Sequence, residues 1–163
     1  MGFSGLVERL RCALPAAGAR PPDTWSGAVG PETPVERLRF TVFDTELTGL
    51  HPRTDHIVSI GAVRMTGSTI RAGETFARLV RPPGPVRSES VIVHGITPDD
   101  LADQPGLEEV MPQFLDFIRE TVLVGHFIGI DLGFVNRFLR LRRRGCLRNP
   151  ALDTRRLHDW LYE

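Results

Sequence analysis

Three consecutive β-branched and aromatic runs constrain the fold of this chain more than any other feature of its sequence. They cover residues 39–44, 56–65 and 68–80. Runs of this composition predict strands, and the Thr66-Gly67 step between the last two predicts a tight hairpin turn. The three strands are therefore expected to form an antiparallel sheet.

The second half of the chain alternates between helical and strand patterns. Apolar residues at helical spacing predict helices, and short apolar runs predict strands. The expected elements are a helix starting at Thr97–Asp100, a helix over 107–120, a strand over 121–125, a helix over 131–144, a strand over 151–153 and a helix over 154–162. Pro112 conflicts with an unbroken helix, so we expect a kink there or a start nearer Val110. Strands followed by this alternation predict a mixed α/β sheet flanked by helices.

The first 36 residues are expected to lie outside this domain, which would occupy residues 37–163. One helical face of residues 3–14 is apolar and consists of Phe3, Leu6, Val7, Leu10 and Leu14. This pattern predicts an amphipathic helix that packs on its own domain or on a partner protein. Residues 15–36 are rich in Pro, Gly and Ala and have no periodicity, which predicts a linker.

The charges of the chain balance, because 20 basic residues, all of them arginine, match 20 acidic ones. A neutral total argues against broad, non-specific binding to nucleic acid. No apolar run reaches the roughly 18 residues that a membrane helix needs. The two cysteines, Cys12 and Cys146, have no metal-ligand spacing and are interpreted as ordinary thiols. We therefore expect a soluble, cytoplasmic protein with no membrane partner.

Three acidic residues fall at the expected ends of core strands. Asp44 and Glu46 are two residues apart and so point to the same side of an extended segment, while Asp131 lies between a strand and a helix. Taken singly, the first two could belong to a solvated turn, and Asp131 could simply favour a helix start. Together, three carboxylates at the ends of adjacent strands predict a site for hard divalent cations such as Mg²⁺.

Four segments in a fixed order resemble the motifs of DnaQ-like (DEDD superfamily) 3′–5′ exonucleases. Residues 42–50 (VFDTELTGL) resemble the first motif, usually DTETTG, and residues 57–63 (IVSIGAV) resemble the second strand. Residues 90–97 (SVIVHGIT) resemble the segment that ends in HGIT, and residues 124–131 (VGHFIGID) resemble the second acidic motif. Asp153-Thr154 fits the next strand. The resemblance, which is to the polymerase III epsilon subunit and ribonuclease T group, covers about residue 37 to the C-terminus.

This resemblance implies a ribonuclease H-like fold and a two-metal hydrolysis of terminal phosphodiesters. Asp44, Glu46 and Asp131 would be the catalytic residues and would bind two Mg²⁺ or Mn²⁺ ions. The residues that match family positions around the terminal nucleotide are Thr48, Gly49, Leu50, Val93, His94 and Ile130. The implied partners are 3′ ends of single-stranded DNA or RNA, and a polymerase or another protein that binds the N-terminal helix.

The sequence departs from the family pattern in its last motif. The family ends with H-x4-D, a general base and a fourth carboxylate on a C-terminal helix, and no such motif follows Asp131. His158 comes too early to supply the base. Several alternatives therefore stay open: a fragment of an active exonuclease, an inactive module that binds nucleic acid or a partner protein, a site completed by another chain, or another metal-dependent hydrolase of similar fold.

Overall fold

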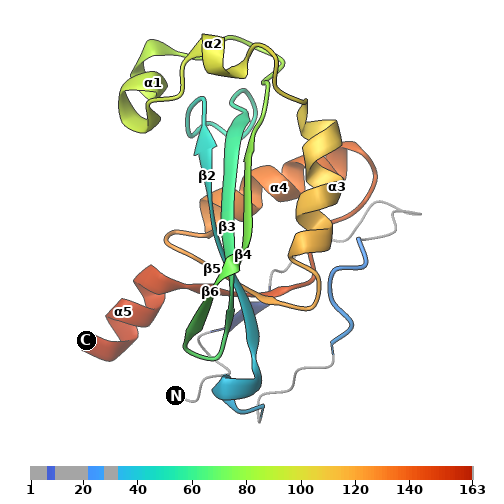
Figure 1. The fold of residues 1–163 in the computed structure, drawn as a ribbon, viewed down its shortest axis with the longest axis vertical. Coiled ribbons are helices and arrows are strands. Elements are labelled where there is room, and N and C mark those ends of the chain that lie inside the picture. The colour runs from blue at the N-terminus through green and yellow to red at the C-terminus, as the bar shows by residue number, and fades with distance from the viewer. Residues whose placement is uncertain (1–6, 10–21, 28–32, 163) are drawn as a thin grey trace.

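The computed structural model describes residues 7–9, 22–27 and 33–162 (Figure 1). Six strands form one sheet in the order β1-β6-β5-β2-β3-β4. Their bounds are β1 Val7–Arg9, β2 Arg39–Leu47, β3 Ile57–Thr66, β4 Thr69–Leu79, β5 Val122–Gly125 and β6 Pro150–Asp153. β2, β3 and β4 are antiparallel neighbours, while β5 runs parallel to both β2 and β6. The predicted mixed sheet, with three antiparallel strands first, is confirmed.

Five α-helices and a short 3-10 helix are described around the sheet. Their bounds are η2 Val35–Arg37, α1 Ser88–His94, α2 Pro98–Leu101, α3 Leu107–Phe117, α4 Gly129–Leu141 and α5 Thr154–Tyr162. In Figure 1, α1 and α2 lie beyond one end of the strands, α3 and α4 lie beside the sheet, and α5 projects away from it. None of the described helices is long and apolar enough to traverse a bilayer.

The main core lies between one face of the sheet and the helices α3 and α4. Odd-numbered residues of β2 such as Phe43 and Leu47 point into it. The Phe114 ring of α3 packs at 5.3 Å from Phe43 and at 5.7 Å from Phe76 of β4, measured between ring centroids. Because side chains alternate along a strand, the even-numbered residues of β2 face the other side of the sheet, where Phe40 joins a smaller apolar cluster.

Several local predictions are confirmed by the structure. Gly67 has a φ of 54° in the turn between β3 and β4, as a tight hairpin turn requires. The hydroxyl of Thr97 accepts the Asp100 N–H, and the Asp100 carboxylate accepts the Thr97 N–H, which forms a capping box at the start of α2. The strands β5 and β6 and the helix α5 also lie where the sequence predicts them.

The bounds of two helices differ from the prediction, and α3 ends at Phe117, three residues before the predicted position 120. α3 begins at Leu107 and continues through Pro112, so the start nearer Val110 is wrong. Proline removes one hydrogen bond of the helix, and the burial of Val110, Met111 and Phe114 against the sheet outweighs that loss. α4 begins two residues before Asp131 and ends three residues before the predicted position 144.

The prediction of a helix over residues 3–14 is wrong for Val7–Arg9, which form the strand β1. The rest of that helix lies outside the described residues. β1 pairs antiparallel with β6 and so covers a strand edge that would otherwise expose unpaired backbone groups. A contact with an available strand edge is non-local and therefore overrides the local helical periodicity.

The linker prediction is wrong for residues 22–27, which pack on the domain. Thr24 is 1% exposed, and its carbonyl accepts the Glu120 N–H at 2.9 Å. The Ser26 N–H and hydroxyl donate to the Glu120 carboxylate at 2.8 and 2.9 Å. The remainder of the predicted linker up to residue 32 lies outside the described residues.

Cys146 also departs from its prediction, because it is buried and disulfide-bonded rather than an ordinary thiol. β6, which begins four residues after Cys146, pairs with β1 at the edge of the sheet. The sequence around Cys146 gave no indication of a disulfide bond. Cys12 lies outside the described residues.

Candidate active site

Two unpaired carboxylates lie at the end of the central strand β2. Asp44 is exposed and Glu46 is half-buried, on the face of β2 opposite Phe43 and Leu47. Neither has a hydrogen bond or ion pair with another residue in the part of the chain that the structure describes. Each is therefore available to a ligand.

Thr45, between these two acids, fixes the third one. Its backbone N–H and its hydroxyl both donate to Oδ1 of Asp131, at 2.9 and 2.6 Å. Asp131 lies in the first turn of α4 and is 4% exposed. The two bonds connect α4 to β2, so the structure places Asp131 beside the Asp44–Glu46 pair.

Burial and a neighbouring like charge both disfavour the ionised form of Asp131. Burial raises the pKa of Asp131 to about 6, the Thr45 hydroxyl opposes that rise, and the nearby Asp44 charge adds to it. Among the described residues, no three His, Cys, Asp or Glu side chains are spaced to hold a metal ion between them. The three predicted acids are thus neighbours, without forming a closed coordination shell.

A hollow of about 480 Å³ opens beside Glu46, between β2 and α1, and is called the β2–α1 pocket below. One wall is formed by residues 45–50, and the other by Arg87 and by residues of α1. Five of the six residues that the resemblance assigns to the terminal nucleotide line it, namely Thr48, Gly49, Leu50, Val93 and His94. Ile130 does not line the pocket; it lies next to Asp131 in the first turn of α4 and is partly exposed.

The His94 ring has one satisfied and one unsatisfied nitrogen. Nδ1 accepts the Ile96 N–H at 3.0 Å, in the turn where Gly95 adopts a left-handed φ of 75°. An accepting Nδ1 leaves the proton of the neutral ring on Nε2. Nε2 is buried and has no hydrogen-bond partner in the described part of the chain. His94, which lines the β2–α1 pocket, therefore has a buried donor without a partner among the described residues.

Asp55 and Arg87 are site residues that sequence reasoning missed. The Asp55 carboxylate is buried below the loop that carries Thr48 and lies 3.2 Å from an Arg87 nitrogen. The only hint in the sequence was an isolated acid just before an apolar strand, a position that is usually exposed.

His126 contacts the start of α5. Its Nδ1 lies 3.0 Å from the Thr154 hydroxyl, and the Asp153 carboxylate accepts the Phe127 N–H at 3.0 Å. These bonds hold the loop between β5 and α4 against the start of α5. Phe127, which has a φ of 52°, is fixed by them in an unusual backbone conformation.

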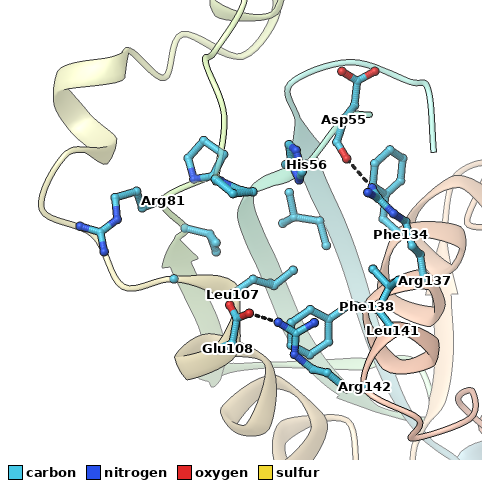
Figure 2. Close-up of a pocket in the computed structure, with 15 residues that line it drawn as sticks. Asp55, His56, Arg81, Leu107, Glu108, Phe134, Arg137, Phe138, Leu141 and Arg142 are labelled. Atoms are coloured by element: carbon cyan, nitrogen blue, oxygen red, sulfur yellow. Dashed lines mark hydrogen bonds and ion pairs between the residues drawn. The ribbon is translucent and has the colours of Figure 1, made fainter. Parts of the chain in front are cut away.

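A second hollow, of about 380 Å³, lies between the start of β3, the end of β4, and the helices α3 and α4 (Figure 2). Its floor is apolar and includes Leu107, Phe134 and Phe138, and an ion pair between Arg142 and Glu108 crosses one side (Figure 2). Neither the three acids nor the residues assigned to the nucleotide line it. Of the two hollows, only the β2–α1 pocket is therefore lined by predicted site residues.

Comparison with known proteins shows that the chain is similar to exonucleases and to polymerase III subunits. A family model described as "Exonuclease", of the RNase T type, matches residues 41–162. A DNA polymerase III subunit epsilon-like protein of Rhodobacter capsulatus is 44% identical over 76% of the chain. The DNA polymerase III subunit epsilon of Aquifex aeolicus is 36% identical over 72% of the chain.

The solved structure of exonuclease X in complex with 5′ overhanging duplex DNA is similar in fold. It has a TM-score of 0.54 and 26% identity, and the match covers 76% of this chain and 64% of that one. The predicted ribonuclease H-like architecture is thereby confirmed. The match spans 18% of the length of the Rhodobacter protein and 57% of the Aquifex protein.

Proposed function

The chain belongs to the RNase T exonuclease family, and from this we propose that it is a metal-dependent 3′–5′ exonuclease domain that removes terminal nucleotides from DNA or RNA. The observation that carries the proposal is the pair of hydrogen bonds from Thr45 to Asp131. They place a third carboxylate beside Asp44 and Glu46, next to a pocket of nucleotide size. Residues 22–27 and 33–162 would form this domain together.

Asp44, Glu46 and Asp131 are the residues that we expect to hold two divalent cations. Their oxygens are hard donors of the kind that Mg²⁺ and Mn²⁺ prefer, and Asp44 and Glu46 have no partner among the described residues. The raised pKa of Asp131 reflects a buried carboxylate next to a like charge, which a cation would relieve. Bound metal ions would activate a water and stabilise charge on the leaving 3′ oxygen.

The β2–α1 pocket supports the binding of a terminal nucleotide. The spare Nε2–H of His94 suits a phosphate or sugar oxygen, because an unsatisfied buried donor gains most from a new acceptor. Leu50 and Val93 expose apolar side chains on opposite walls, where a base or sugar could pack between them. Ile130 would contact the nucleotide from the Asp131 side.

A general base and a fourth carboxylate are still needed for rapid hydrolysis, and the sequence contains no H-x4-D motif after Asp131. A positioned base contributes roughly 10²–10⁴-fold to the rate of such reactions. The second candidate function is a module of the same fold that binds nucleic acid or a partner protein without cleaving. The relatives named as polymerase III subunits support a polymerase as the partner and a cytoplasmic setting.

The two candidates differ in a direct assay. The chain is incubated with single-stranded DNA or RNA labelled at the 5′ end, in the presence of Mn²⁺. Stepwise shortening from the 3′ end that is lost in Asp44→Ala and kept in Asp103→Ala, an exposed acid outside the site, supports the exonuclease. Binding without shortening supports the module, and neither binding nor shortening contradicts both.

A further inference from the structure

The two walls of the β2–α1 pocket are joined beneath its surface by one buried carboxylate, that of Asp55. Its side chain is 3% exposed. Oδ2 accepts the His51 N–H at 2.8 Å, and Oδ1 lies 3.4 Å from the Thr48 hydroxyl that donates to it. Oδ1 also lies 3.2 Å from Nη2 of Arg87, the residue immediately before α1. One side chain therefore contacts both walls.

On the loop side, the backbone at Gly49 packs directly against the Asp55 carboxylate. A Cβ added at Gly49 would lie 2.6 Å from the Asp55 carboxylate, which is too close for any side chain. The backbone of this loop is held from below as well, because Arg137 of α4 donates to the carbonyls of Asp55 and Arg53, both at 2.8 Å. Figure 2 shows the first of these bonds. The loop is thus a fixed wall.

On the helix side, α1 buries few of its side chains. Ser90 is the only buried residue of α1, while Ile92 and Val93 are 85% and 83% exposed. A helix that buries so little apolar surface gains little stability from packing. The ion pair to Asp55, whose buried charge needs a partner, is therefore a main link between α1 and the loop.

We propose that Asp55 and Arg87 are positioning residues that set the width of the β2–α1 pocket for the terminal nucleotide. The inference rests on the function proposed above and identifies a part of that site. Neither residue is placed at the reacting atoms. They act by holding Val93 and His94 at a fixed separation from Thr48 and Leu50, so that one nucleotide contacts both walls at once.

Amide hydrogen exchange tests the link without any need for activity. In Arg87→Ala, exchange should become about three- to tenfold faster at residues 88–94 and 48–51, the range expected for a partly exposed ion pair. Arg87→Lys, which keeps the charge, should restore most of the protection. Arg119→Ala removes a similarly exposed ion-paired arginine elsewhere and should leave these segments unchanged. Unchanged exchange in Arg87→Ala overturns the proposal.

Oligonucleotide kinetics test what the link does. Arg87→Ala should raise KM about three- to tenfold and leave kcat within about twofold, because binding is lost equally in the ground and transition states. Arg87 lines the pocket and could touch the substrate directly, so Asp55→Asn is compared with it. If Arg87 acts through Asp55, the double variant is no worse than the poorer single variant. Additive effects on KM overturn the positioning role.

The failure of this inference and that of the proposed function have different signatures. If the wild-type chain neither binds nor shortens an oligonucleotide, the proposed function is wrong, and the positioning role falls with it even where the exchange data show the link. If the wild-type chain binds or shortens its substrate and the Arg87 and Asp55 variants match it, only the positioning role is wrong.

Discussion

Thr45 donates both its backbone N–H and its hydroxyl to one oxygen of Asp131, at 2.9 and 2.6 Å. The nearby charge of Asp44 adds to the rise in the Asp131 pKa that burial causes. Thr45, which lies between Asp44 and Glu46, thus orients the carboxylate of Asp131. Because the same bonds join β2 to α4, Thr45 contributes both to the geometry of the site and to the stability of the fold.

Thr45→Val should destabilise the protein by about 1.5–3 kcal/mol, the range for a hydrogen bond to a charged group. The hydroxyl lowers the Asp131 pKa, so its removal should raise that pKa further and make the loss larger at pH 8 than at pH 4. Thr41→Val is the matched control, because among the described residues its buried hydroxyl bonds the neutral Thr121 hydroxyl, at 2.8 Å, and no charged group. Urea unfolding at both pH values measures this, and equal pH dependence in the two variants would contradict it.

Asp131→Asn should stabilise the metal-free protein at pH 8. The pKa of Asp131 is raised to about 6 from 3.8, so the folded state binds the proton more tightly than the unfolded state. The contribution of this carboxyl to the free energy of unfolding is therefore fully present below about pH 4, and it is lost as the pH rises through 6. Two pKa units correspond to about 3 kcal/mol. In EDTA, the urea midpoint of Asp131→Asn should be higher than that of the wild type at pH 8. The two midpoints should be equal at pH 4.

Much of this site could be predicted because its positions follow from local sequence. Strand alternation places Asp44 and Glu46 on one side of β2, and the strand-to-helix junction places Asp131 at the start of α4. What could not be predicted is the distance between them, because the Thr45–Asp131 bond joins residues 86 positions apart. Non-local pairs of this kind are fixed by packing and not by pattern.

The failed predictions have the same physical cause. Val7–Arg9 are periodic like a helix but pair with β6 as a strand, and residues 22–27 have a loop composition but are fixed by Asn149 and Glu120. Asp55 was missed because an isolated acid gives no indication of burial. In each case the observed structure depends on a contact with a residue more than thirty positions away along the chain.

Mn²⁺ should raise the Tm of the wild-type protein at pH 7.5, and much less that of Asp44→Asn or Glu46→Gln. A ligand at a hundred times its Kd stabilises the folded state by about 2.7 kcal/mol. The effect should weaken as the pH falls below about 6, because protons then compete for Asp131. Thermal scans with and without EDTA measure this. An equal Mn²⁺ shift in Asp44→Asn would rule out the assignment of this ligand, and Asp103→Asn serves as the control.

Gly49→Ala should destabilise the protein by about 1–3 kcal/mol, because its Cβ would meet the Asp55 carboxylate at 2.6 Å. Gly133→Ala is the matched control, since a Cβ at that position of α4 meets nothing within 4 Å. Alanine is favoured over glycine in helices, so this control should be stabilising by about 0.5–1 kcal/mol. Urea midpoints of the two variants should move in opposite directions. A neutral Gly49→Ala would mean that the loop relaxes freely around Asp55.

Asn149→Asp should release residues 22–27 and destabilise the fold by about 3 kcal/mol or more at pH 7. Asn149 is completely buried, and its Nδ2 donates to the carbonyls of Thr24, Ile118 and Thr121 at 3.3, 3.0 and 2.9 Å. A carboxylate there would place a buried charge among acceptors alone. Because burial raises the pKa of such a group, the penalty should diminish as the pH falls towards 4.

The matched control for this substitution is Asn136→Asp. Asn136 is also buried, but its Oδ1 accepts the Leu147 N–H at 2.8 Å, a bond that a carboxylate keeps. Asn136→Asp should therefore lower the free energy of unfolding less than Asn149→Asp does. Trp25 packs in the small apolar cluster on the other face of the sheet, so its fluorescence reports on the 22–27 segment when the second tryptophan is removed by Trp160→Phe. Equal destabilisation in the two variants, with unchanged Trp25 emission, would show that the Asn149 bonds do not hold this segment.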